Sequence, residues 1–382
     1  MWIELPDELE KDILNINNEY DKLASVLNEL FESMYKGKHV IYCSPDLLVL
    51  LSNNCFITNK MKSYIKWILN KYLLFYSAED IMDYKIIVTS DEKIRVSNCI
   101  YYVPYEILYD IRETSFITEH ESDAVFYKYI FDHINKYFKC NDYSVCLENI
   151  SGHGTNIPST IDECLKKNRI TLCITDSDKD YDNCDYGGTY KKAKEVYDDR
   201  KDDSIFMLDV LGVREKENLF SPNIYKEFSK QHIKFLTVLE KFIDNENVIK
   251  YFDIKEGVKY QQYLDSFWLS YYLTVVDELK NEKIFHLPKE NEEEGKYCCI
   301  SGIGRHLNEE VCMALLCDKE EFEKIKNSGK YNKKKLQLIV NWRKTLNDLL
   351  PDFIFEEWVR LYKIMFSWGC CMSENTKPYF VI

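Results

Sequence analysis

Residues 170–178 read ITLCITDSD, an apolar run that ends in two aspartates separated by one serine. The apolar part predicts a buried strand, because short β-branched stretches bounded by polar residues are typical of sheet interiors. Residues two apart in an extended segment point the same way, so Asp176 and Asp178 can face one site at the strand's end. Such a carboxylate pair suits Mg²⁺ or Mn²⁺, although Asp and Ser are also ordinary turn formers.

Strand and helix patterns alternate on both sides of this run, over residues 141–260. In chain order these are a strand YSVCLE (143–148), a helix PSTIDECLKK (158–167), the strand above, a helix TYKKAKEVYDD (189–199), a strand SIFMLDV (204–210) and a later strand YFDI (251–254). Successive βα units predict a mainly parallel sheet with functional groups at the carboxyl ends of its strands.

Two further regions flank this central part. Residues 1–140 mix helical and strand patterns without a chemical motif, so we expect an N-terminal α/β region of unknown role. Residues 261–382 carry apolar residues at spacings of three and four, as in YLDSFWLSYYLTVVDELK, which predicts a C-terminal helical region. The expected fold class is therefore α/β, with a central domain over 141–260.

Glu148 is the acidic residue at the end of the strand that precedes the Asp-Ser-Asp segment. If the two strands are parallel neighbours, its carboxylate lies beside Asp176 and Asp178. The glycines of SGHGTN (151–156) let the chain turn tightly, and Pro158 is favoured in the first helical turn. This order predicts three carboxylates at one edge of the sheet.

A strand ending in Glu, a glycine loop, a helix and a strand ending in Asp-x-Asp resemble the Toprim fold of topoisomerases, primases and several nuclease families. Residues 213–219, VREKENL, look like the R-x-x-E-N-L element of the overcoming-lysogenisation-defect (OLD-like) Toprim nucleases and related bacterial antiphage effectors. Residues 251–259, YFDIKEGVK, resemble the lysine segment of that family. The four elements cover the middle of the chain and leave both flanking regions unmatched, so the resemblance implies a Toprim-like catalytic domain over residues 141–260.

This resemblance implies a role for each matching residue. Glu148, Asp176 and Asp178 would hold a divalent metal, Mg²⁺ or Mn²⁺. Glu217 would complete a second metal position with Glu215 close by, and Lys255 would stabilise charge on a phosphate.

Two residues of the glycine loop bear on this metal site. Gly152 stands where the family often carries a second acid, so either another group supplies that ligand or the second metal is bound more weakly. His153 could act as a ligand or proton shuttle, or be an ordinary loop histidine.

The expected function is a metal-dependent nuclease acting on DNA or RNA, with transfer RNA among the substrates considered. The resemblance implies an antiphage effector controlled by a separate ATPase, since this chain lacks a GxxxxGK[ST] motif. The terminal regions would serve docking or self-association into a homo-oligomer. The alternatives are a catalytically decayed Toprim scaffold or regulatory subunit and, third, a primase or topoisomerase.

The net charge of −14 argues against coating nucleic acid by bulk attraction, but not against a local basic face. The clearest basic segment, also interpretable as a solvated surface, comprises Lys324, Lys326, Lys330, Lys333, Lys334, Lys335, Arg343 and Lys344. No membrane-spanning run or signal-peptide pattern is found, so a cytoplasmic protein is expected.

Fourteen cysteines without a secretory pattern are expected to be reduced thiols. Zinc binding by the C-terminal group is a less favoured alternative, because no CxxC pair occurs. That group comprises Cys298, Cys299, His306, Cys312, Cys317, Cys370 and Cys371.

Overall fold

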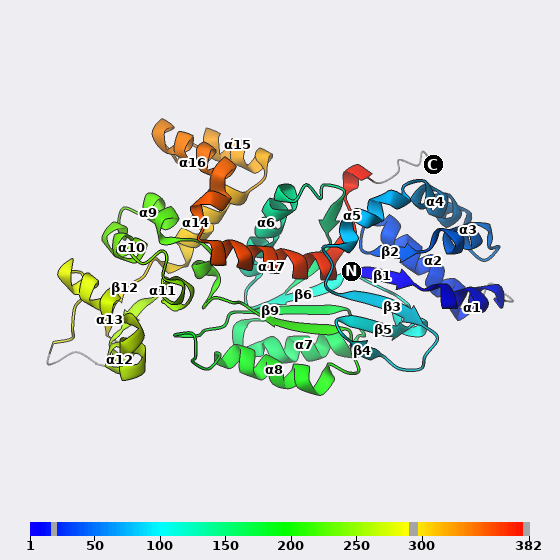
Figure 1. Ribbon diagram of the computed structural model, residues 1–382, viewed down its shortest axis with the longest axis horizontal. Helices are drawn as coiled ribbons and strands as arrows, with labels where there is room; N and C mark the ends of the chain where they lie inside the picture. The colour runs from blue at the N-terminus through cyan, green and yellow to red at the C-terminus, as the bar shows by residue number, and fades with distance from the viewer. Residues whose placement is uncertain (17–20, 290–296, 377–382) are drawn as a thin grey trace. The chain divides into compact units, whose positions relative to one another are not determined.

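The computed structural model describes residues 1–16, 21–289 and 297–376 (Figure 1). It is a mixed α/β protein, as the sequence predicts. The chain forms two compact units: unit 1 spans the boundary expected at residue 140, and unit 2 spans the one expected at residue 260. Unit 1 comprises Met1–Ile174, Lys192–Asp209 and Arg360–Ile382, and unit 2 comprises Thr175–Lys191 and Val210–Val359.

The first sheet of unit 1 has five strands in the order β2-β1-β3-β5-β4, with β4 antiparallel at the edge. Its strands are β1 (Trp2–Leu5), β2 (Val40–Cys43), β3 (Lys85–Thr89), β4 (Arg95–Ser97) and β5 (Ile100–Pro104). Helices α1 (Glu10–Leu14), α2 (Lys22–Tyr35), α3 (Pro45–Asn53), α4 (Asn59–Asn70) and α5 (Tyr76–Glu79) accompany it. Side chains of Asp21, Ser44 and Thr58 accept hydrogen bonds from the first turns of α2, α3 and α4, which fixes where these helices begin.

The second sheet of unit 1 is the parallel sheet that the central sequence pattern predicts. Its order is β10-β9-β6-β8, with bounds β6 (Thr114–Thr118), β8 (Leu147–Ser151), β9 (Thr171–Thr175) and β10 (Phe206–Val210). All five residues of β6 and of β9 are buried, in keeping with their central places. The sheet therefore includes a strand that precedes residue 141.

Helices cover both faces of this sheet. On one face α7 (Ile157–Lys166) and α8 (Gly188–Arg200) contribute Ile157, Ile161 and Ala193 to a core that includes Ile117 and Cys173 (Figure 1). On the other face α6 (Glu121–Tyr137) packs on β6, where Tyr127 contacts Phe116. The rings of Tyr362 and Phe366, from α17 (Asp352–Gly369), stack on Phe131 of α6. The sheet is thus the middle layer of an α/β/α arrangement.

Unit 2 is mainly helical, which confirms the prediction for the C-terminal region. One short antiparallel pair lies among its helices, formed by β11 (Gly257–Lys259) and β12 (Cys298–Ser301). The helices are α9 (Pro222–Phe228), α10 (Ile233–Glu240), α11 (Glu246–Tyr251), α12 (Tyr260–Leu264), α13 (Ser266–Asn281), α14 (Gly304–Leu316), α15 (Lys319–Asn327) and α16 (Lys333–Thr345).

Two expected strands differ from the structure. Residues 251–254 form the end of α11 and a turn, because Phe252 N–H donates to the Val248 carbonyl and extends the helical pattern. Residues 143–148 are divided between two strands. β7 (Tyr143–Val145) pairs antiparallel with β13 (Cys370–Met372), and Leu147 already begins β8.

Among the described residues, no helix combines the length and apolar character needed to cross a membrane.

Candidate functional site

The turn after β9 holds the two aspartates by their backbone. The N–H groups of Ser177 and Asp178 both donate to the Arg214 carbonyl, at 3.0 Å each, and the Ser177 hydroxyl donates to the Val213 carbonyl at 2.7 Å. Asp178 has φ of 50°, in the left-handed region that non-glycine residues seldom adopt. Such strain is kept where the surroundings enforce it, and here the anchoring carbonyl of Arg214 does so.

Gly187 closes the same turn against Asp178. Its N–H donates to the Ser177 carbonyl at 2.9 Å. A Cβ at Gly187 would lie 2.3 Å from Asp178 Oδ2, so a larger residue there would displace the carboxylate. The glycine therefore sets the position of the Asp178 side chain.

The Arg214 side chain ties this turn to the segment before Lys255. Its guanidinium donates to the Lys179 carbonyl at 3.0 Å and to Asp180 at 2.7 Å, and it pairs with Asp253 at 3.2 Å. Asp180 also accepts a hydrogen bond from Gln262. Asp180 is therefore anchored at its carboxylate, with its side chain 41% exposed.

Glu217 lies in a short 3₁₀ helix (Lys216–Leu219) before α9, and Glu215 directly precedes that helix. Their side chains are 1% and 6% exposed, respectively. Lys255 forms an ion pair with Glu215, and its Nζ lies 3.8 Å from Glu217 Oε2. The second oxygen of Glu215, Oε1, is buried without a hydrogen-bond partner in the described part of the chain. Two buried carboxylates thus share one ammonium group.

Burial and the neighbouring charges shift the pKa values of the acids and of Lys255. Burial, followed by the neighbouring Glu217 carboxylate, raises the pKa of Glu215 to about 8, although Lys255 opposes the shift. Burial alone lowers the pKa of Lys255, but Glu215, Glu217 and Asp176 outweigh it and the pKa is raised. Burial also raises the pKa of Asp178, against the effect of Arg214 and Lys255. Five of the expected residues therefore form one electrostatic cluster within unit 2.

Glu148 does not join this cluster. It is the second residue of β8, at the start of the strand, and β6 separates β8 from β9. Its carboxylate forms an ion pair with Arg169, which precedes β9. The expectation that Glu148 ends a strand adjacent to Asp176 is corrected: it lies at the amino end of the sheet.

Glu119 is the acidic residue that follows a central strand, and the sequence interpretation overlooked it. It comes directly after β6, the parallel neighbour of β9. It lies near enough to Cys173 to contribute, after burial, to the raised pKa of that thiol. Four residues later the buried Asp123 caps α6 by accepting the His120 N–H at 2.9 Å. The signal was present in residues 114–123, TSFITEHESD, a strand pattern followed by three acids.

Gly152 and His153 have structural roles in the turn after β8. The Gly152 N–H donates to the Thr118 carbonyl at 2.7 Å, and a Cβ there would lie 2.2 Å from Ile157 Cγ1. An acidic side chain therefore has no room at this position. His153 has φ of 52°, and its Nδ1 lies 3.4 Å from the Ser151 hydroxyl.

The donor chemistry of the unit 2 cluster fits a hard divalent cation, because buried carboxylate oxygens are its preferred ligands. Within residues 1–16, 21–289 and 297–376, however, no group of three or more His, Cys, Asp or Glu side chains is arranged to hold a metal ion. Of these acids, Glu215 forms an ion pair with the Lys255 ammonium group.

All fourteen cysteines are free thiols. Burial raises the pKa of Cys312 and Cys317, in keeping with thiols buried in the protein interior.

The C-terminal basic segment lies on α15 and α16 and the turn between them. Lys324 pairs with Glu320, Lys326 with Glu323 and Lys330 with Glu310. Arg343 donates to the Cys317 carbonyl and lies over the Phe322 ring. These contacts are those of a solvated helical surface whose charges are partly balanced.

No protein-family model, curated protein or solved structure matches this chain.

Proposed function

We propose that the chain is a metal-dependent nuclease whose acids in unit 2 hold Mg²⁺ or Mn²⁺ and cleave phosphodiester bonds. The observation that carries this proposal is the convergence of Asp176, Asp178, Glu215, Glu217 and Lys255. They come from three segments far apart in the sequence, and their charges are mutually perturbed. Strongly shifted pKa values in one cluster are characteristic of catalytic sites.

The chain's own residues divide the work as follows. Asp176, Asp178 and Glu217 would hold the metal, with Glu215 joining once Lys255 leaves it. A bound divalent ion would supply an activated water and neutralise the leaving oxygen. Lys255, released from Glu215, would place its ammonium group against the phosphate. Arg214 is a positioning residue, because its guanidinium holds the Asp178 turn through the Lys179 carbonyl and Asp180.

The biological setting is part of the same proposal and rests on the Toprim resemblance. It places the chain among Toprim effectors of bacterial antiphage defence, with a separate ATPase as controlling partner. DNA and RNA, including transfer RNA, are both substrates to be assayed, because the metal chemistry attacks either backbone.

The test is cleavage by the purified full-length chain of plasmid, single-stranded DNA and transfer RNA, with Mg²⁺ or Mn²⁺ and with a chelator. We expect activity that chelation, Glu217→Gln and Asp176→Asn each abolish, while Glu148→Gln retains it. Glu119→Gln belongs in the panel because Glu119 follows the neighbouring strand of the sheet. Cleavage that persists under chelation and in both acid variants would contradict the proposal.

A second candidate is a catalytically decayed scaffold or regulatory subunit. It is favoured by the Lys255–Glu215 pair, in which a lysine already supplies the positive charge. In that case calorimetric titration with Mn²⁺ gives no binding heat and no substrate is cut. Binding heat that disappears in Glu217→Gln would favour the nuclease.

A further inference from the structure

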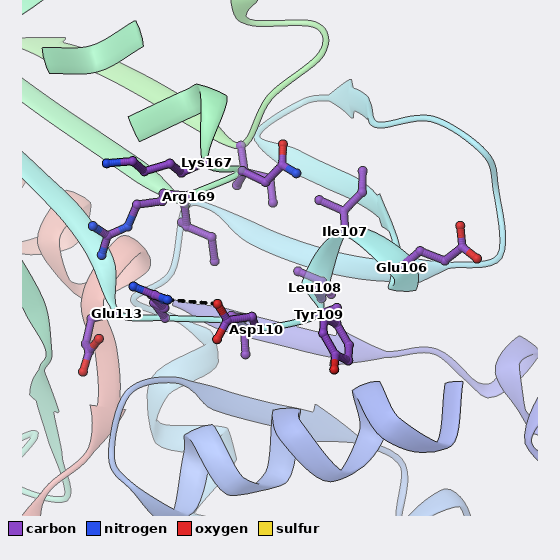
Figure 2. Close-up of a pocket in the computed structure, with 13 residues that line it drawn as sticks. Glu106, Ile107, Leu108, Tyr109, Asp110, Glu113, Lys167 and Arg169 are labelled. Carbon is purple, nitrogen blue, oxygen red and sulfur yellow. Dashed lines mark hydrogen bonds and ion pairs between the residues drawn. The ribbon is translucent and has the colours of Figure 1, made fainter. Parts of the chain in front are cut away.

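A cavity of about 620 Å³ lies in unit 1, outside the acidic cluster (Figure 2). It is lined by residues 106–113, before β6, by residues 167–170, before β9, and by Ile205. Its volume is in the range of small-molecule sites, about 300–1,000 Å³. The cavity therefore lies at the amino ends of the two central strands.

Two arginines supply the cavity with positive charge. The Arg169 side chain is 14% exposed and pairs at one end with Glu148, while its Nε is buried without a hydrogen-bond partner among the described residues. Arg112 donates from Nη2 to Asp110 at 3.0 Å and is 61% exposed. A buried guanidinium donor without an acceptor is uncommon in proteins.

The two guanidinium groups are close enough to perturb each other. Burial, followed by the charge of Arg112, lowers the pKa of Arg169, while Glu113 opposes the shift. Figure 2 shows Arg169 across the cavity from the segment of Asp110 and Glu113. Glu113 also pairs with Lys38, so its charge is partly taken up elsewhere. An anion between the arginines would relieve their repulsion.

Apolar side chains line the cavity beside these charges. They are Ile107, Leu108, Ile111, Ile170 and Ile205. Tyr109 adds an aromatic ring that is 61% exposed. An apolar wall beside a forked cationic group suits a ligand with a planar organic part and a phosphate, because guanidinium groups bind phosphate through paired hydrogen bonds.

We propose that this cavity binds a phosphorylated small molecule of nucleoside monophosphate size, with its phosphate on Arg112 and Arg169 and its base against the apolar wall. The site is distinct from the proposed nuclease centre and does not depend on it. Glu148 acts there as the internal carboxylate that holds Arg169 and that an incoming phosphate must partly replace.

Isothermal titration of the full chain with AMP, adenosine and inorganic phosphate tests the proposal. We expect saturable AMP binding that is roughly tenfold weaker in Arg169→Gln and in Arg112→Gln, since each removes a charge-assisted hydrogen bond. Lys166→Gln is the matched control, because Lys166 is exposed, pairs with Asp162 and does not line the cavity. Adenosine and phosphate alone should each bind more weakly than AMP.

A gain of affinity provides an independent measurement. Glu148→Gln frees Arg169 and should tighten AMP binding several-fold, an effect that a damaged fold cannot produce. If Arg169→Gln fails to fold, AMP binding is compared between the parent and Arg112→Gln alone. This variant should fold, because the Arg112 side chain is mostly exposed. The proposal is overturned if AMP gives no saturable heat, if both arginine variants bind as the parent does, or if adenosine or phosphate alone binds as tightly as AMP.

Discussion

Lys255 brings one positive charge to two carboxylates that are almost fully buried. In water each carboxylate would be solvated separately. Here the charge of Glu215 and Glu217 is stabilised mainly by Lys255, and each carboxylate repels the other. Because removing charge from water is costly, one proton is retained by the pair to a higher pH than usual. The state of this cluster therefore depends on pH even without a ligand.

That dependence gives a prediction for the stability of the metal-free protein. The pKa of Glu215 is about 8 in the fold and near its ordinary value of about 4.3 in the unfolded chain, so the native state binds more protons between these values. This group's contribution to stability is complete below about pH 4 and is lost as pH rises through about 8. Urea unfolding in EDTA from pH 5 to 8 should show a fall in the free energy of unfolding that Glu215→Gln reduces. Glu148→Gln should keep the parent's slope, and an unchanged slope in Glu215→Gln would count against the assigned shift.

Asn218 gives a second prediction at this scale. Its buried amide donates to the carbonyls of Ile249 and Phe252, both at 2.9 Å, and so joins the loop of Glu217 to the end of α11. Asn218→Ala leaves two carbonyls unsatisfied and should lower the free energy of unfolding by about 2–4 kcal/mol. The control Asn341→Ala, on the exposed face of α16, should change it by less than about 0.5 kcal/mol. An equal fall in the free energy of unfolding of the two variants would contradict the stabilising role of the Asn218 amide.

The turn between β8 and α7 can be tested at the scale of the element. Gly152→Ala places a Cβ 2.2 Å from Ile157 Cγ1, so the free energy of unfolding should fall by about 1–3 kcal/mol. Gly188→Ala, where a Cβ meets nothing within 4 Å, is the matched control and should be nearly neutral. Chemical denaturation of both variants measures the difference. If Gly152→Ala is as stable as the control, the position does not require glycine.

Of the four strands of the parallel sheet, β9 and β10 were predicted from the sequence, whereas the edge strand β8 and the central strand β6 were not. β9, β10, α7 and α8 lie where the periodicity indicates. β8 was misplaced because it is an edge strand with partly exposed residues, while the apolar residues before it belong to β7 and pack with β13. This displacement made Glu148 look like the end of a strand. The short strand β6 was missed, and with it Glu119.

The sequence indicated which residues would form the acidic cluster, but not which of them would contact each other. The order of Asp176, Asp178, Glu217 and Lys255 along the chain is visible in the sequence. Lys255 pairs with Glu215 from a turn that is fixed by distant residues. The Lys255 carbonyl accepts a hydrogen bond from the Gly304 N–H at 3.0 Å. Contacts between segments so far apart depend on packing that local patterns do not encode.

Metal binding should stabilise the whole molecule. A ligand that binds the native state alone at 100 times its Kd adds about 2.7 kcal/mol to the free energy of unfolding. Mn²⁺ should therefore raise the thermal unfolding temperature of the parent protein but not that of Asp176→Asn. Asp185→Asn is the control, because Asp185 lies in the same turn with its side chain 90% exposed. A shift of equal size in Asp176→Asn would indicate that the metal binds elsewhere.

The pairing of β7 with β13 has a consequence for synthesis on the ribosome. Tyr143–Val145 emerges long before Cys370–Met372, and at about 5–20 residues per second the delay is on the order of tens of seconds. Unit 2 can be translated completely during that interval. The nascent chain therefore carries an unfinished unit 1, with β7 lacking its partner strand, until residues 370–372 have emerged.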